Sequence, residues 1–136
     1  MYTFFKTIAE QENWIFDYAR RDFQNLANEL GDPEQIFLFL DPVTFTTEFG
    51  DYNEIDLRIY TSSFLLLVNS DFDELYSEKY ETRIRPIIDT AITKIKDQIY
   101  CNNKLTIESW RTTEIVNLFD QNLDGIIVNF VISIEN

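Results

Sequence analysis

Apolar residues recur every three to four positions over the first part of the chain, which is the spacing of an amphipathic helix. The recurrence covers residues 4–30, and Gly31 and Pro33 follow it as residues that commonly end helices. Trp14 and Tyr18 lie beside the apolar stripe, about one helical turn apart. The pattern predicts one long helix in which these two rings either cover a second element or form part of a partner-binding surface.

The next third of the chain alternates between apolar and polar residues, the pattern typical of strands. Strands are predicted over residues 36–40, 43–49 and 55–60. The polar Thr61-Ser62-Ser63 then interrupts the alternation, where a bulge is expected. Residues 64–68 are apolar throughout, which predicts either a central strand covered on both faces or a strand that meets a partner subunit, with Phe64 as a candidate contact.

Helical spacing returns over residues 75–99, with acidic residues in the first turns and basic residues near the end. Pro86 lies inside this segment and predicts a lost hydrogen bond and a kink, unless the helix starts near Arg85. Further strands are predicted over residues 105–107, 113–119 and 126–134. The element order predicts an α+β fold, a mainly antiparallel sheet packed on one face by two long helices, in a single domain covering residues 1–136.

Composition narrows the classes of partner. Among 136 residues, 24 Asp and Glu face 11 Lys and Arg, so the formal charge is -13. Such a charge repels phosphate backbones and anionic lipid surfaces, so nucleic acid is not expected as a tight ligand. The apolar runs are much shorter than the roughly 20 residues of a membrane-spanning helix, so no membrane is expected either. The simplest account of the acidity is a well-solvated surface.

Catalytic chemistry is hard to assemble from this sequence. The chain has no histidine, which removes Ser-His and Cys-His nucleophile pairs and imidazole metal ligands. Its three glycines form no phosphate-binding loop. Cys101 is the only cysteine, so no internal disulfide is possible, and we interpret it as a small apolar filler in a protein kept in a reducing cytoplasm. The prediction is that the chain is not an enzyme and has no catalytic, cofactor-binding or metal-binding residues.

One segment imitates a calcium site. Residues 120–125, Asp-Gln-Asn-Leu-Asp-Gly, match the first half of an EF-hand loop, with oxygen ligands at loop positions 1, 3 and 5 and glycine at position 6. The second half fails, because Val131 stands where a bidentate glutamate is required and the following residues alternate as a strand. A turn that Gly125 relaxes before a final strand is the better interpretation.

Several segments together suggest a family. They are the amphipathic start, the Asp41-Pro42-Val43 break into a strand, the apolar strand leading through residues 69–73 into a helix, and residues 122–125 feeding the last strand. In these features and in size, the chain resembles the small tail-terminator and neck-ring proteins of tailed bacteriophages, including those of crAss-like phages. The family has no catalytic residues to transfer.

The resemblance implies a structural virion protein of the phage neck or tail, assembled in the cytoplasm of the bacterial host. It implies a homo-oligomeric ring, sixfold or twelvefold, that joins the portal-proximal connector to the tail and contacts neighbouring neck, portal-adaptor or tail proteins. DNA would pass through an acidic channel without specific binding, because carboxylates repel phosphates. Candidate interface residues are the aromatic anchors Trp14, Tyr18, Phe64 and Trp110 and the basic pair Arg83 and Arg85.

Two other classes of function compete with the ring. An acidic inhibitor could mimic DNA and occupy the nucleic-acid groove of an enzyme, which predicts carboxylates spaced along one exposed face. A small hydrolase is the third class, and the missing histidine, phosphate loop and complete metal motif count against it.

Overall fold

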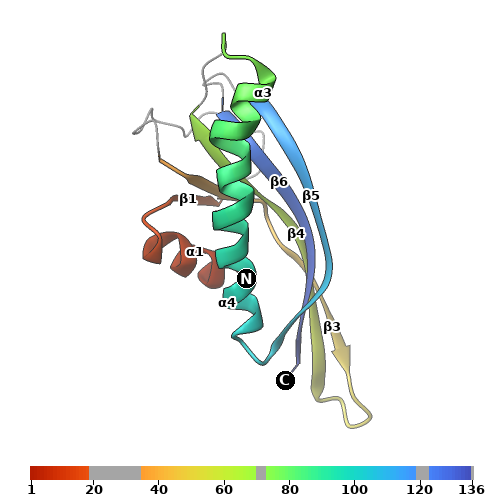
Figure 1. Cartoon of the computed structure of the whole chain (residues 1–136). Coiled ribbons are helices and arrows are strands. Elements are labelled where there is room, and N and C mark those ends of the chain that lie inside the picture. The colour runs from red at the N-terminus through yellow and green to blue at the C-terminus, as the bar shows by residue number, and fades with distance from the viewer. Residues whose placement is uncertain (19–34, 70–72, 119–122, 136) are drawn as a thin grey trace.

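The computed structural model describes residues 1–18, 35–69, 73–118 and 123–135, which form a six-stranded sheet with helices on one face (Figure 1). The strands are β1 (Ile15–Tyr18), β2 (Phe37–Leu40), β3 (Thr44–Phe49), β4 (Ile55–Asn69), β5 (Leu105–Leu118) and β6 (Leu123–Glu135). The helical segments are α1 (Tyr2–Gln11), α3 (Tyr76–Lys79), η1 (Tyr80–Ile84), η2 (Ile87–Ile92) and α4 (Thr93–Tyr100). The last four are continuous, and we call residues 76–100 the long helix.

β4 is the central strand of the sheet, whose order is β1-β2-β4-β6-β5. One edge of β4 pairs with β6 over its whole length from Leu57. Its other edge is shared, because β3 pairs with residues 55–61 and β2 with residues 64–67. Among the described strands, the β1–β2 pairing is parallel and the other pairings are antiparallel.

The main core lies between the sheet and the helices. Phe5 of α1 is fully buried there, with ring centroids 5.1 Å from Phe64 and 5.3 Å from Phe130. The long helix adds Ile84, Ile87, Ala91, Ile92, Ile95 and Ile99. A second buried cluster, formed by Phe37, Phe39, Leu65, Leu67 and Leu123, lies on the opposite face of the sheet. Residues 64–68 are therefore a central strand covered on both faces, the first of the two interpretations of this apolar run.

The predicted long first helix is wrong, because α1 ends at Gln11. Asn13 adopts the left-handed conformation, with φ 56°, and the Trp14 amide donates to the Ala9 carbonyl at 2.8 Å. This is a Schellman-type end, in which asparagine takes the place of the more usual glycine. Residues 15–18 then form β1 alongside β2, while the remainder of the predicted helix, with Gly31 and Pro33, lies outside the described residues.

The predicted fold class is therefore wrong as well. The described residues are mostly strand, with one long helix and the short α1, and they do not form a sheet packed by two long helices. The prediction failed because the periodicity of residues 4–11 was extended across Asn13, where the helix ends.

The second predicted helix is confirmed and begins at Tyr76, well before Arg85. Pro86 lies between the two π-helical segments η1 and η2. A π turn shifts the hydrogen-bonding pattern by one residue, which lets the helix continue past a residue that has no amide hydrogen.

Two predicted breaks in strands are absent. β4 keeps regular register with β6 through Thr61-Ser62-Ser63, without the expected bulge. These polar residues mark the place where the other edge of β4 changes partner from β3 to β2. Likewise, β5 is one strand instead of two, with register shifts after Ile107 and after Ile115.

Candidate functional site

One hairpin of the sheet has a turn end, residues 49–56, that extends beyond β5 and β6 near the chain's C-terminus (Figure 1). It consists of β3 and the first half of β4, residues 44–61, and we call it the arm. Its turn is closed by the Gly50 amide donating to the Glu54 carbonyl at 2.9 Å and by the Asn53 amide donating to the Gly50 carbonyl at 3.1 Å. Asn53 has φ 61°, a conformation that asparagine tolerates better than most residues.

The arm exposes large aromatic side chains. Phe45 is 61% exposed, Phe49 63% and Tyr52 at the tip 90%. The Phe45 ring lies against Tyr60 of β4, with centroids 5.9 Å apart, so it is held in place although it faces water. Rigid, exposed aromatic rings are the side chains that most often anchor protein interfaces.

The arm is also acidic. Glu48, Asp51, Glu54 and Asp56 are all exposed, and residues 44–57 contain no lysine or arginine. Nearby Arg58 is half-buried, and its Nε atom has no hydrogen-bond partner within the described part of the chain. The arm therefore presents four exposed carboxylates and three exposed aromatic rings, while its one cation, Arg58, is half-buried.

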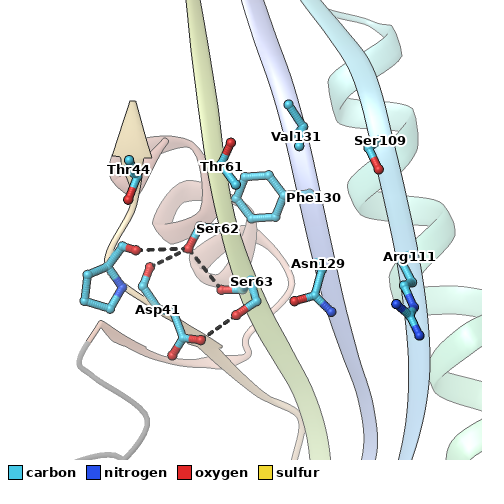
Figure 2. Close-up of a pocket in the computed structure, with 11 residues that line it drawn as sticks. Asp41, Thr44, Thr61, Ser62, Ser63, Ser109, Arg111, Asn129, Phe130 and Val131 are labelled. Carbon is cyan, nitrogen blue, oxygen red and sulfur yellow. Dashed lines mark hydrogen bonds between the residues drawn. The ribbon is translucent and has the colours of Figure 1, made fainter. Parts of the chain in front are cut away.

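A hollow of about 430 Å³ lies at the base of the arm. Figure 2 shows Asp41 on one side and Arg111 on the other, with β4 and β6 between them. The floor comes from positions that alternate with the main core, so it is on the sheet face opposite the helices; these positions include Thr61, Ser63, Ser109, Asn129 and Val131.

Hydrogen bonds fix the Asp41 side of the hollow. The Ser63 hydroxyl donates to the Asp41 carboxylate, and the Asp41 amide donates to the Ser63 carbonyl at 3.0 Å. The Ser62 hydroxyl donates to the Asp41 carbonyl at 2.9 Å. These bonds tie the β2–β3 junction to β4 and so fix the base of the arm.

The Arg111 side chain on the far side of the hollow is exposed, and its guanidinium makes no hydrogen bond or ion pair with any described residue. Most other cations in the described part of the chain are engaged. Arg83 donates to Glu74 at 3.1 Å, Lys94 pairs with Glu12, and the Lys96 ammonium lies 5.3 Å from the centre of the Trp110 ring. Arg111 is thus available to bind an anionic group from outside the chain.

The predicted basic pair is engaged within the long helix. The Arg85 guanidinium donates a hydrogen bond to the Glu81 carboxylate at 3.1 Å and pairs with Asp89 at 3.5 Å, and the hydrogen bond to Glu81 raises the pKa of Arg85. Acidic and basic residues therefore alternate along the exposed side of this helix. For Arg83 and Arg85, an interface role stays a prediction.

The predicted aromatic anchors do not form one surface. Tyr18 at the end of β1 is 41% exposed and packs edge-on against Tyr2, with centroids 5.1 Å apart. Trp110 is half-buried on β5, at the opposite edge of the sheet, while Trp14 packs against the main core. Phe64 is fully buried, 5.7 Å from the Trp110 ring. The interface role of these four residues remains a prediction. The arm and Arg111 are not among the candidate residues that the sequence predicted.

The described residues hold no group of three or more Cys, Asp or Glu side chains that could bind a metal ion. Residues 120–122 of the EF-hand-like segment lie outside the described residues, and Gly125 lies within β6 instead of in the preceding turn. Cys101 is exposed at the end of the long helix, so its interpretation as an apolar filler is wrong. No described helix is long and apolar enough to span a membrane.

Comparison with protein-family models gives no match to this chain, and none of the curated proteins matches it in sequence.

Proposed function

We propose that the chain is a non-catalytic structural subunit that assembles with copies of itself into a ring of the phage neck or tail, between the portal-proximal connector and the tail. The observation that carries this proposal is the arm. Its three exposed aromatic residues, Phe45, Phe49 and Tyr52, are held on a hairpin that projects from the sheet.

Contact with a partner protein accounts for the exposed aromatic rings of the arm better than permanent exposure to solvent does. Exposed apolar patches on a soluble protein commonly mark interaction sites. A contact between the arm and a different surface of an identical subunit repeats from copy to copy, and it closes into a ring where the rotation between copies allows closure. The resemblance to neck-ring proteins supplies the biological setting, and the charge of -13 fits a bore through which DNA slides.

The proposal predicts that the purified protein forms closed rings. Light scattering of the protein as it elutes from a size-exclusion column gives the mass of the assembly, and negative-stain images show its shape. Replacing Phe45, Phe49 and Tyr52 together by serine is expected to leave monomers, because the aromatic anchors are lost while the core is untouched.

A matched control replaces three exposed apolar residues of the long helix and its start, Leu75, Tyr76 and Tyr100, which are 66%, 72% and 68% exposed. This variant is expected to assemble like the wild type. Wild-type protein that stays monomeric at the highest attainable concentration would contradict the proposal, and copurification of such monomers with a nuclease or polymerase would favour the inhibitor instead.

A further inference from the structure

We propose that the ring closes by pairing β3 of one copy with residues 109–115 of β5 in the next copy, so that one sheet continues from subunit to subunit. This inference rests on the proposed ring and specifies its interface. The partner is a second copy of this chain.

Strand direction allows the pairing. β3 and β5 lie at opposite edges of the stretch β3-β4-β6-β5, in which each described neighbour is antiparallel to the next. Three antiparallel steps make β3 and β5 run in opposite directions. A copy rotated about an axis roughly along the strands therefore brings its β3 beside β5 as another antiparallel neighbour, the more stable kind of pairing.

The exposed edges are similar in length and regularity. Residues 109–115 of β5 lie between its two register shifts, so this stretch is regular, and β3 spans residues 44–49. Ten of these thirteen residues are exposed, and Thr47, Trp110 and Ile115 are partly buried. Bulges at both ends of the regular stretch would limit pairing elsewhere along β5, as bulges do at many sheet edges.

The position of β1 limits where along the strands the two copies can pair. Across the sheet, Thr44 of β3 lies level with Ser109 of β5, through the paired row Thr44–Thr61–Val131–Ser109. In the same way, β1 lies level with residues 112–115 of β5, as the row Tyr18–Leu40–Phe64–Val128–Thr112 shows. Because β1 stands one strand farther out than β3, an undisplaced neighbour would bring its β5 into the place of β1. The neighbour must therefore be displaced along the strands.

A displacement of about six residues lowers Ile115 of the neighbour to the height of Thr44, below β1. A displacement by an even number of residues keeps each side chain on its own face of the sheet. Six residues correspond to about 20 Å along the strands, and four strands to about 19 Å across them. The resulting strand tilt of about 45° to the ring axis is close to the tilt of closed barrels, so the displacement is compatible with closure.

This alignment brings complementary charges together. With Thr44 opposite Ile115, Glu48 of the arm lies opposite Arg111 of the neighbour, four residues along each strand. Both side chains are exposed. They lie on the face opposite the helices, because their cross-strand partners, Leu57 and Asn129, occupy positions of β4 and β6 that alternate with the main core. Arg111, which has no partner among the described residues of its own chain, thereby gains a carboxylate.

Neither of the two carboxylates on β5 lies beside Glu48 in this alignment. Glu108 precedes the paired stretch and accepts a hydrogen bond from Ser133 at 2.6 Å. Glu114 lies on the helix face, where Phe45 and Thr47 of the arm would be its neighbours. The paired face of the interface therefore joins Thr44, Thr46 and Glu48 to Ile115, Thr113 and Arg111.

A charge exchange tests the pairing. Light scattering at matched concentrations compares the wild type with Glu48→Lys, Arg111→Glu and the double variant that carries both changes. Each single variant is expected to weaken assembly roughly tenfold or more, since like charges then face each other. The double variant is expected to recover assembly, because every interface again joins opposite charges.

Two exposed positions distant from the pairing serve as controls, Asp97→Lys and Lys6→Glu, and both are expected to assemble normally. Melting curves of all variants check that each is folded. If the wild type forms rings and the single variants form them equally well, or the double variant does not recover, the strand pairing is overturned while the ring stands. Wild-type monomers at every concentration overturn both.

Discussion

Gly125 lies inside β6, directly against the backbone of β4. A Cβ atom added at this position would overlap the carbonyl oxygen of Leu66. The overlap is with main chain, which cannot rotate away as a side chain can. The absence of a side chain at Gly125 is therefore what lets the two central strands approach each other closely.

Gly125→Ala is expected to lower the free energy of unfolding by about 1–3 kcal/mol, because the strands must separate locally to admit the methyl group. Urea unfolding followed by circular dichroism measures the change. Gly50→Ala is the control, since its added atom would meet only the flexible end of the Glu54 side chain. Equal unfolding midpoints for the two variants would contradict this account.

At the scale of elements, α1 is attached to the sheet mainly through Phe5, Ile8 and Ala9, its buried residues. Phe5 contacts rings from both β4 and β6. Phe5→Ala is expected to reduce the free energy of unfolding by about 3–5 kcal/mol through the cavity that it leaves. Phe45→Ala, on the arm, is expected to change it by less than about 1 kcal/mol while weakening assembly. Melting curves and light scattering separate the two effects.

The sequence predicted these elements unevenly. Alternation located β2, β3 and most of β6, and helical spacing located the long helix, because each signal is local and repeated. The end of α1 was missed, since it depends on a single asparagine in a left-handed conformation. The continuity of β4 was missed for a different reason. Its polar residues face a hollow that four segments build together, and alternation along one strand cannot reveal that.

The candidate site was harder to predict than the fold. The turn at Gly50 could be predicted, but nothing in residues 44–49 shows that both faces of their strand would be exposed to water. Arg111 could not be distinguished from Arg83 and Arg85 by sequence alone, because its lack of a partner among the described residues is a property of the folded chain. A search for strands rich in threonine and exposed aromatics, followed by acidic turns, would have singled out the arm.

For the whole molecule, the charge of -13 predicts that the protein does not hold DNA. Fluorescence anisotropy of a labelled duplex at about 150 mM salt is expected to show no binding at protein concentrations up to about 100 µM, where cationic proteins bind non-specifically. A basic DNA-binding protein provides the positive control. Tight binding would contradict a bore that lets DNA pass freely.

β4 connects the arm to the centre of the molecule without interruption, and this arrangement has a mechanical consequence. A pull on the tip of the arm is carried along β4, parallel to the strand and therefore across its ladder with β6 from Leu57 to Asn69. The bonds of that ladder then share the load in shear instead of opening one after another. In the proposed ring, tension from a neighbouring subunit would therefore pass directly into the core of the subunit that carries the arm.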